Sequence, residues 1–539
     1  MSLVLTPVEV LAGYPPHDDS LTGLLASRVA VRPDAPVLVF GSRHWCYHAL
    51  ARAAELCADL LAAAGIRTGD AVACCAPNSD LHVVILLACA RLGALFAPLN
   101  SALTDGELSY VLGHTRAQVL FSREAACARV SGLCVSLELD TRVLALETLG
   151  LAGAGAEDVL AALVMAVSGT PSGQGPNVPR DTPLVVVYTS GTTGFPKGVV
   201  HTHGNYVWAA EAFVERMHLQ PSDRLMTVLP FFHINALFYS LGGALAAGGC
   251  LIVSEAFSAS RFWAEAAASG ATQFNTLAAV GNILVKRPRQ EYNPNHVLSK
   301  VYGGPISQEV ADVFPAEFHV PDLIEGYGMS EIPGACNNPY IGMRKLGSIG
   351  LPARHPTRGA FVEMRVVDDA GKVLGPHTVG ELEVKTPIVF KEYLHDPVQT
   401  RAAFHEGWFV TGDLVRYDED GYYYFVARKK DIIRVRGENV AGAELDRVLG
   451  AHPAVAEAAT IGVAAELGDE EILAVLVSRG AAPSFQELAD WCRVQLAAIK
   501  VPRYWVWVDT LPLTPTARVA KHILKKDTTL ATRAFDLKA

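Results

Sequence analysis

An apolar run, LVVVY at residues 184–188, stops abruptly at the glycine- and hydroxyl-rich segment TSGTTGFPKG. A short apolar run bounded by turn residues predicts a strand buried on both faces. The segment after it combines glycines, which allow close backbone approach, with hydroxyl donors and one lysine charge. A buried strand that ends in such a loop predicts an anion site at a sheet edge. The residues assigned to this site are Thr189, Ser190, Gly191, Thr192, Thr193, Gly194 and Lys197.

Residues 189–198, the anion loop, do not form a P-loop of the Walker type, because the GK[ST] ending that leads into a helix is missing. A solvated surface loop is the alternative, and any three of these residues alone would favour it. The whole string, directly after a buried strand, favours phosphate binding.

Short β-branched runs alternate with helical patterns through the first 430 residues, which predicts α/β layers. The strand-like YYYFVA at 422–427 stops at the charged RKKD, and a small α+β pattern follows. This pattern has helices over 440–449 and 484–496, strands at 456–463 and 471–477, and the apolar YWVWV. We therefore predict an α/β fold with a large N-terminal domain of several subdomains, residues 1–427, and a small α+β C-terminal domain, residues 428–539.

The net charge and the hydropathy pattern argue against several classes of function for this chain. The formal net charge of -10 argues against a nucleic-acid reader and a polybasic membrane-surface protein. Two apolar stretches reach membrane-span length, but 81–99 carries Arg91 and 225–254 is divided by proline, asparagine and glycine residues. We expect a buried helix and a series of short elements instead, and no stable membrane insertion.

The ten cysteines are scattered without metal-ligand spacing, which is typical of reduced thiols. The first twenty residues lack a basic region followed by an unbroken apolar run, so a secretory signal is not expected. These two features predict a cytoplasmic protein. A homo-oligomer is left open.

Six further strings follow the anion loop in order. With it, they resemble the adenylate-forming superfamily of acyl-CoA synthetases, nonribosomal adenylation domains and firefly luciferases over nearly the whole chain. A weaker resemblance, in 390–400 and 436–453, is to crotonobetaine/carnitine:CoA ligases. The six strings are LPFFH (229–233), YGMSE (327–331), GELEVK (380–385), WFVTGD (408–413), ARKKDIIRVRGENV (427–440) and LPLTPTARVAK (511–521).

The resemblance implies an ATP site. Tyr327 would stack on adenine beside a flat backbone ledge at Gly303 and Gly304. Asp413 would accept the ribose hydroxyls, with Arg428 alongside. An aspartate after glycine is by itself usually a turn residue, and only its place in the ordered motifs favours this role.

The resemblance also assigns the phosphate end of the nucleotide. Ser330 would donate to the α-phosphate. Glu331, together with Thr189, would be an oxygen ligand for Mg²⁺, which neutralises the triphosphate.

Two positions bear on the acid. His233 resembles the aromatic gate of the acyl channel. Amino-acid-activating relatives place an aspartate there to pair with the substrate ammonium, and a mostly neutral histidine offers no such charge. Gly328 occupies the position that acetate-specific relatives fill with tryptophan, which predicts a carboxylic acid larger than acetate.

The C-terminal assignments rest on the same resemblance. Lys430 lies at the pivot about which the lid domain would rotate between half-reactions. Gly437 would lie beside the pantetheine arm of coenzyme A. The motif that usually ends TGK reads TARVAK, so Arg518 is expected to act on the carboxylate and α-phosphate, with Lys521 as the second candidate.

The function implied is ATP-dependent conversion of the acid to acyl-AMP and pyrophosphate, followed by transfer to coenzyme A. Loading of a separate phosphopantetheinyl carrier protein is one alternative. A non-catalytic nucleotide-binding homologue, suggested by the altered TARV string, is another.

Overall fold

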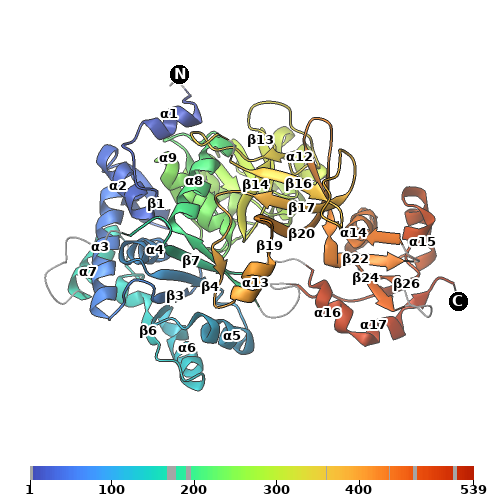
Figure 1. Cartoon of the computed structure of the whole chain (residues 1–539), viewed down its shortest axis with the longest axis horizontal. Helices are drawn as coiled ribbons and strands as arrows, with labels where there is room; N and C mark the ends of the chain where they lie inside the picture. The colour runs from blue at the N-terminus through green and yellow to red at the C-terminus, as the bar shows by residue number, and fades with distance from the viewer. Residues whose placement is uncertain are drawn as a thin grey trace. The chain divides into compact units, whose positions relative to one another are not determined.

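The computed structural model describes residues 4–153, 155–166, 178–189, 196–359, 361–435, 438–464, 470–513 and 519–538. Contacts divide them into two compact units (Figure 1). The first unit holds the described residues up to Thr189, then Pro196–Glu363 and Lys385–Phe409. The second unit holds Met364–Val384 and the described residues from Val410 onward.

The first unit contains two large sheets. One has the strand order β15-β14-β13-β12-β11-β9-β10-β1-β2 and is parallel through its central strands. Its strands are β1 (Pro36–Phe40), β2 (Arg43–Cys46), β9 (Arg224–Thr227), β10 (Cys250–Val253), β11 (Gln273–Asn275), β12 (Lys300–Gly303), β13 (Asp322–Met329), β14 (Ile332–Asn337) and β15 (Leu351–Pro352).

The other sheet of the first unit has the order β18-β8-β7-β4-β3-β5-β6. The apolar run before the anion loop forms its strand β7, and Leu184, Val185, Val186 and Val187 are at most 1% exposed. The predicted buried strand is therefore confirmed. The strands of this sheet are β3 (Ala71–Cys75), β4 (Leu95–Leu99), β5 (Val119–Ser122), β6 (Arg142–Ala145), β7 (Pro183–Tyr188), β8 (Gly198–Thr202) and β18 (Glu392–Tyr393).

Helices pack on these sheets, and two of them contact both. Helix α4 contacts β1 of one sheet and β4 and β7 of the other, while α8 contacts β7, β8 and β14. A helix between two sheets needs an apolar surface all round, as the sequence of α4 has. The helices of the first unit are α1 (Pro7–Ala12), α2 (Leu21–Val31), α3 (Tyr47–Ala63), α4 (Asp80–Leu92), α5 (Asp105–Thr115), α6 (Glu124–Ser136), α7 (Ala156–Ala166), α8 (His203–Met217), α9 (Gly243–Ala247), α10 (Phe262–Ser269), α11 (Ala278–Lys286), α12 (Gln308–Ala316) and α13 (Pro397–Ala402), with the short 3-10 helices η1 (Leu146–Leu149) and η3 (Arg289–Glu291) and the π-helix η2 (Asn235–Gly242).

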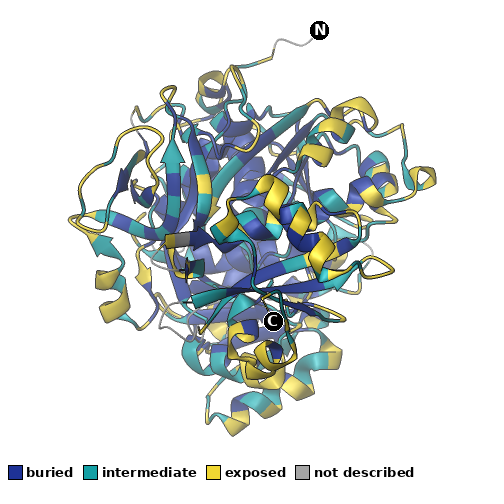
Figure 2. Ribbon diagram, turned by 90° about the vertical axis from the view of Figure 1, so that its right-hand side faces the viewer, coloured by how far each residue is buried: buried dark blue, intermediate teal, exposed yellow. Residues whose placement is uncertain are grey.

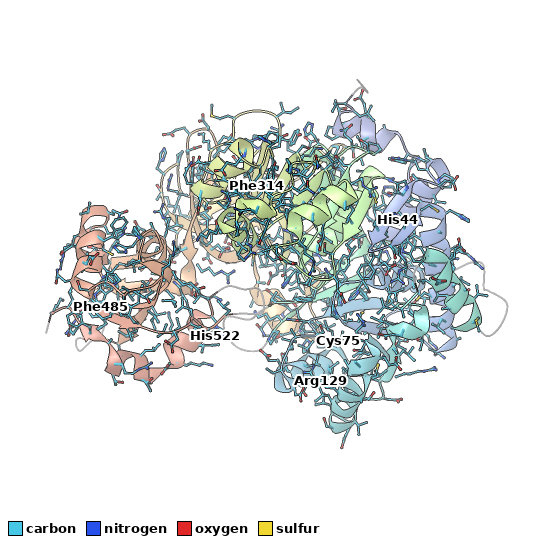
Figure 3. All side chains as sticks on the ribbon, turned by 180° about the vertical axis from the view of Figure 1, so that it is seen from behind. His44, Cys75, Arg129, Phe314, Phe485 and His522 are labelled. Atoms are coloured by element: carbon cyan, nitrogen blue, oxygen red, sulfur yellow. The ribbon has the colours of Figure 1, made fainter. Side chains whose placement is uncertain are left out.

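The core of the first unit is rich in aromatic side chains. The sheet strands are largely buried and the outer helix faces are exposed (Figure 2). Phe314 of α12, labelled in Figure 3, is fully buried and packs with Phe274, Trp263 and Phe318. These rings hold α10 and α12 against β11, a central strand of the sheet, which carries Phe274.

Three smaller sheets hold the strands of the second unit, and the first of these sheets also includes β19 of the first unit. The order of the first is β16-β17-β20-β19, with β21 paired to β20; β22 pairs with β23; and the third has the order β24-β25-β26-β27. The elements predicted after residue 440 are confirmed as α14, β24, β25, α15 and β26. Elements from residue 363 onward are β16 (Glu363–Val367), β17 (Gly380–Lys385), β19 (Phe404–His405), β20 (Trp408–Tyr417), β21 (Tyr423–Arg428), η4 (Lys429–Asp431), β22 (Ile432–Val435), β23 (Glu438–Ala441), α14 (Gly442–Gly450), β24 (Val455–Ala464), β25 (Glu470–Ser478), α15 (Phe485–Gln495), η5 (Ala498–Lys500), β26 (Tyr504–Trp507), α16 (Lys521–Lys526), α17 (Thr528–Arg533) and β27 (Phe535–Asp536).

The two membrane-length stretches form short elements. Residues 225–254 are split among β9, η2, α9 and β10, and 81–99 is split between α4 and β4. Among the described residues, no helix is both long and apolar enough to cross a bilayer. All ten cysteines are free thiols. The predicted domain boundary after residue 427 stays a prediction.

Candidate functional site

The ends of the anion loop are held together where β7 and β8 separate. The Thr189 amide donates to the Lys197 carbonyl at 3.0 Å, and the Thr189 hydroxyl lies 3.5 Å from the same oxygen. The predicted anion ligands Ser190, Gly191, Thr192, Thr193 and Gly194 lie outside the described residues. The structure therefore places the two loop ends, Thr189 and Lys197.

Lys197 and Glu331 meet through a tyrosine that the sequence reasoning missed. The Lys197 Nζ lies 4.6 Å from the centroid of the Tyr393 ring. The Tyr393 hydroxyl donates to Glu331 Oε1 at 2.8 Å. Burial, with the adjacent Glu331 charge, raises the pKa of Tyr393, so the hydroxyl stays protonated as a donor. A cation, a phenol and a carboxylate thus form one cluster at the end of the anion loop.

Strand pairing explains how residues so far apart in sequence form this cluster. Strand β18 pairs with β8 so that Tyr393 faces Val199, two residues after Lys197. The Phe390 amide donates to the Glu331 carbonyl at 2.8 Å, which ties the approach to β18 to the β13–β14 turn. The sequence signal for Tyr393 is the string FKEYLHDP at 390–397, which lies in the weaker resemblance to crotonobetaine/carnitine:CoA ligases.

The Glu331 carboxylate fits Mg²⁺ only as a shared ligand. Glu331 is buried, and no group of three or more metal-ligating His, Cys, Asp or Glu side chains occurs in the described part of the chain. Mg²⁺ is commonly held by one or two carboxylates plus substrate phosphates, rather than by a cage of protein ligands. The single buried carboxylate of Glu331 matches the protein part of that donor set.

The hairpin of β13 and β14 positions Tyr327, Ser330 and Glu331. Tyr327 pairs with Cys336 across the hairpin, and Ser330 and Glu331 form its turn. The buried imidazole of His201 donates from Nε2 to the Ser330 carbonyl at 2.7 Å. Burial lowers the pKa of His201 to about 4, so it makes this bond in its neutral form.

The predicted ledge at Gly303 and Gly304 is formed by close backbone packing. A Cβ at Gly303 would lie 2.5 Å from the Thr276 carbonyl oxygen, and one at Gly304 would lie 2.6 Å from the Gly326 carbonyl oxygen. Any side chain would therefore push these segments apart. Stacking of adenine beside these two glycines is what the resemblance implies and stays a prediction.

Glu325 lies beneath this ledge and was also missed. Its side chain is 5% exposed, Oε1 accepts from the Ile306 amide at 3.2 Å, and no hydrogen-bond partner of Oε2 is present in the described residues. Burial raises the pKa of Glu325 to about 7, opposed by hydrogen bonds from the Ile306 and Gly347 amides.

The raised pKa predicts how stability depends on pH. The folded-state pKa lies above the ordinary value of 4.5, so the stabilisation is complete below pH 4.5 and is lost as pH rises through about 7. We expect Glu325→Gln to gain roughly 3 kcal/mol in unfolding free energy relative to wild type between pH 5 and pH 8, measured by urea unfolding without nucleotide. Glu309→Gln, at an exposed position of α12, is the control. An equal difference from wild type at both pH values would contradict the assignment.

The predicted gate residue His233 lies between β9 and η2. Its ring packs on Phe232 with centroids 4.4 Å apart, and its amide donates to the Pro230 carbonyl at 3.0 Å. The space beside Gly328 is filled, since a Cβ there would lie 2.8 Å from the Tyr239 hydroxyl. A Cβ at Gly326 would lie 2.5 Å from the Tyr302 hydroxyl. The Tyr239 hydroxyl therefore occupies the space that Gly328 alone suggested was open, and the Tyr302 hydroxyl fills the space beside Gly326.

In the second unit, Asp413 and Arg428 come together. They are paired across β20 and β21, with Arg428 Nε 3.7 Å from Asp413 Oδ1. Asp413 is buried and its amide donates to the Thr411 hydroxyl at 3.1 Å. The pairing holds this carboxylate beside a guanidinium, as the resemblance implies.

Of the other four C-terminal candidates, the structure describes Lys430 and Lys521. Lys430 lies in η4, beside Lys429, whose amine contacts Glu381 and Asp369 at 2.8 and 2.9 Å. Lys521 pairs with Asp446 at 2.5 Å. Gly437 and Arg518 lie outside the described residues.

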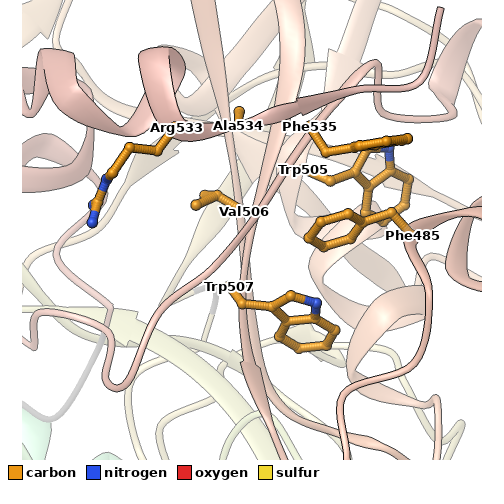
Figure 4. Close-up of a pocket in the computed structure, with 7 residues that line it drawn as sticks. All are labelled: Phe485, Trp505, Val506, Trp507, Arg533, Ala534 and Phe535. Carbon is orange, nitrogen blue, oxygen red and sulfur yellow. The ribbon is translucent and has the colours of Figure 1, made fainter. Parts of the chain in front are cut away.

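A pocket of about 460 Å³ lies elsewhere in the second unit (Figure 4). It contains no residue predicted for the nucleotide or acyl site. Its lining consists of Phe485, Trp505, Val506, Trp507, Arg533, Ala534 and Phe535.

Comparison with known proteins decides the family. Residues 25–394 match the AMP-binding enzyme family, and residues 444–518 match the AMP-binding enzyme C-terminal domain. The chain belongs to the AMP-binding enzyme family. As a member of this family it has the predicted large α/β domain with a smaller C-terminal domain, and it is an AMP-forming acid:CoA ligase that uses ATP, Mg²⁺ and coenzyme A. The predicted boundary lies between the two matched ranges.

Similar members of the AMP-binding enzyme family span nearly the whole chain. Sulfoacetate–CoA ligase of Cupriavidus necator is 34% identical over 510 residues, covering 93% of this chain and 97% of the relative. Long-chain-fatty-acid–CoA ligase FadD13 of Mycobacterium tuberculosis is 30% identical over 512 residues, with coverage of 93% and 97%. The crystal structure of ATP-bound MatB from Rhodopseudomonas palustris superposes with a TM-score of 0.83 at 27% identity, covering 94% of this chain and 98% of MatB.

Proposed function

We propose that this protein joins a carboxylic acid larger than acetate to coenzyme A through an acyl adenylate made at the Lys197–Tyr393–Glu331 cluster. The acid's carboxylate oxygen forms a bond to the α-phosphorus of ATP, and the bond from that phosphorus to the pyrophosphate oxygen breaks. The thiolate of coenzyme A then attacks the acyl carbon, and AMP leaves. The observation that carries the proposal is the direct linkage of Lys197 to Glu331 by Tyr393, at the end of the anion loop.

Each part of the nucleotide has proposed binding groups. Tyr327 stacks on adenine over the Gly303–Gly304 ledge, with Glu325 Oε2 as acceptor for the exocyclic amine. Asp413, oriented by Arg428, accepts the ribose hydroxyls. The ledge packing and the partnerless Glu325 oxygen support the first role, and the Asp413–Arg428 pairing supports the second.

The phosphates are proposed to bind the anion loop, with Lys197 as the point charge and Ser330 as a donor to the α-phosphate. The loop ligands are Thr189, Ser190, Gly191, Thr192, Thr193 and Gly194. Glu331, together with Thr189, would hold Mg²⁺, which when bound neutralises triphosphate charge. The role of Tyr393 is to fix the Glu331 carboxylate.

The C-terminal residues are proposed to separate the two half-reactions. The domain of residues 428–539 turns about Lys430, and Gly437 then lies beside the pantetheine arm. Arg518 acts in adenylation, and the pairing of Lys521 with Asp446 supports assigning that role to Arg518.

The identity of the acid and the cellular compartment of the protein are also proposals. The names of the two relatives specify acids that differ in length and charge, sulfoacetate and long-chain fatty acids, so they do not select one. His233 as the gate disfavours amino acids. The ten free thiols support a reducing compartment, which we take to be the cytoplasm.

A screen of AMP release tests the function. Fatty, aromatic, alicyclic, betaine and dianionic acids are each incubated with ATP and Mg²⁺, with and without coenzyme A. We expect acid-dependent pyrophosphate release and coenzyme A-dependent thioester. Thioester formed only on an added phosphopantetheinyl carrier protein would favour carrier loading, and no pyrophosphate release with any acid would overturn the proposal.

Tyr393→Phe tests the cluster that carries the proposal. The variant keeps the ring beside Lys197 and removes the hydrogen bond to Glu331. A hydrogen bond to a charged group contributes about 1.5–3 kcal/mol, so we expect kcat/KM for ATP–pyrophosphate exchange to fall about 10- to 100-fold. The Mg²⁺ concentration for half-maximal rate should rise. A stability loss without a change in the Mg²⁺ requirement would assign Tyr393 a structural role only.

A further inference from the structure

Arg216, near the end of α8, is a buried cation held only by neutral groups. Its side chain is buried, and the residue is 2% exposed. Nε donates to Asn337 Oδ1 at 3.1 Å, Nη2 to the Gly334 carbonyl at 3.1 Å, and Nη1 to the Tyr302 hydroxyl at 3.5 Å. Within the described residues, Arg216 makes no ion pair with a carboxylate.

Aromatic rings surround the rest of the guanidinium. Its carbon lies 5.3 Å from the Tyr239 ring centroid, 5.4 Å from that of Tyr302 and 5.7 Å from that of Phe213. Ring faces attract a cation but carry no net negative charge. A guanidinium has five N–H donors. The three acceptors named above and the Tyr239 hydroxyl, which also accepts from Arg216, leave one of them for another partner.

The position of Arg216 relates it to the proposed acyl site. A Cβ at Gly334 would lie 2.2 Å from Nη2, so the guanidinium packs directly on this backbone, three residues after Glu331. Gly334 N and the Tyr239 hydroxyl are in turn the neighbours of Gly328. The cation thus lies behind the same hairpin that carries Tyr327, Ser330 and Glu331, beside the two tyrosines that fill the space next to Gly326 and Gly328.

Burial of an unpaired charge is costly, and buried arginines are normally matched by a carboxylate or another anion. Neutral acceptors offset part of this cost. If Arg216 served only to hold α8 against β14, hydrogen bonds would be enough. An uncharged amide side chain would supply them at a lower desolvation cost. A guanidinium is instead the group that binds carboxylate or sulfonate through two parallel hydrogen bonds.

We propose that Arg216 binds a second anionic group, a carboxylate or sulfonate, on a short acid substrate. The inference rests on the proposed function, because it concerns the acid that is adenylated there. The reacting carboxylate lies toward Glu331 and the second anion toward Arg216. Tyr239 and Tyr302 limit the length of the acid, since their hydroxyls fill the space into which a longer chain would extend.

Paired substrates test the proposal. Malonate, succinate, sulfoacetate and 3-sulfopropionate are compared with butyrate and pentanoate in ATP–pyrophosphate exchange. We expect wild type to favour at least one dianion over the monoanions by tenfold or more in kcat/KM. Arg216→Met should reduce that preference 10- to 100-fold, mainly through KM for the dianion, and Arg216→Lys should keep part of it.

A matched variant separates recognition from folding. Arg28→Met removes another buried arginine of the first unit, one bonded to the Ala246 carbonyl and stacked on Tyr14, and should leave the dianion preference unchanged. Equal losses for dianions and monoanions in Arg216→Met, or a wild-type preference for monoanions, would overturn the proposal. The wild-type comparison decides even where Arg216→Met does not fold.

Failure of the proposed function gives a different result. No exchange with any acid would reject adenylation. Arg216 would still be tested by thermal shift, in which sulfoacetate or malonate with AMP should stabilise wild type more than Arg216→Met. Equal shifts in the two proteins would reject the anion subsite.

Discussion

Glu331→Gln is expected to lower kcat for acid-dependent ATP–pyrophosphate exchange about 10²- to 10³-fold, the range found when one preorganised electrostatic group is removed from an active site. Glutamine has nearly the same shape and its amide oxygen can still accept from the Tyr393 hydroxyl, so the hairpin turn should stay in place. The variant lacks the negative charge proposed to hold Mg²⁺. The loss should therefore exceed that of Tyr393→Phe, which leaves the charge in place.

The measurement is exchange of labelled pyrophosphate into ATP over a range of Mg²⁺ concentrations. Glu392→Gln is the matched control, because it removes an exposed carboxylate next to Tyr393 on β18. We expect normal exchange in the control and a loss in Glu331→Gln that excess Mg²⁺ only partly restores. A normal rate for Glu331→Gln at low Mg²⁺ would separate Glu331 from the metal.

Local sequence patterns predict strands and helices, but they do not predict the contact between Tyr393 and Lys197. Strand β7 and the elements after residue 440 follow from apolar runs and turn residues, which act locally, and these predictions were confirmed. Tyr393 reaches Lys197 only because β18 pairs with β8 across about 190 residues of sequence. No local pattern encodes that pairing. Its string was noticed only through resemblance.

Side-chain packing and buried charge in the protein interior are harder to predict from the sequence than strands and helices are. Gly328 suggested an open slot, but whether a glycine leaves a void depends on which side chain packs against it, and here Tyr239 does. Glu325 and Arg216 are charged residues that a sequence reading assigns to the surface by default. Their burial results from sheet and helix packing, so their functional interest emerges only from the fold.

Arg518→Ala is expected to abolish most adenylation while sparing thioester formation. The resemblance assigns to this position a cation that contacts the acid carboxylate and α-phosphate in the first half-reaction only. Loss of such a charge should lower pyrophosphate exchange about 10²- to 10³-fold. Conversion of chemically prepared acyl-AMP and coenzyme A to thioester should continue within about twofold of wild type, because that step does not use the residue.

Lys521→Ala is the comparison that makes the test decisive. The Lys521 amine is 2.5 Å from Asp446, whose pKa burial raises while the lysine charge lowers it. Removing the lysine leaves the half-buried Asp446 carboxylate with only its hydrogen bonds from Thr460, so we expect a lower unfolding temperature for the C-terminal region and little change in exchange at 25 °C. Exchange that is normal in Arg518→Ala and lost in Lys521→Ala would transfer the adenylation role to Lys521. It would also mean that the Asp446 pair opens during catalysis, since the same amine cannot hold Asp446 and the α-phosphate at once.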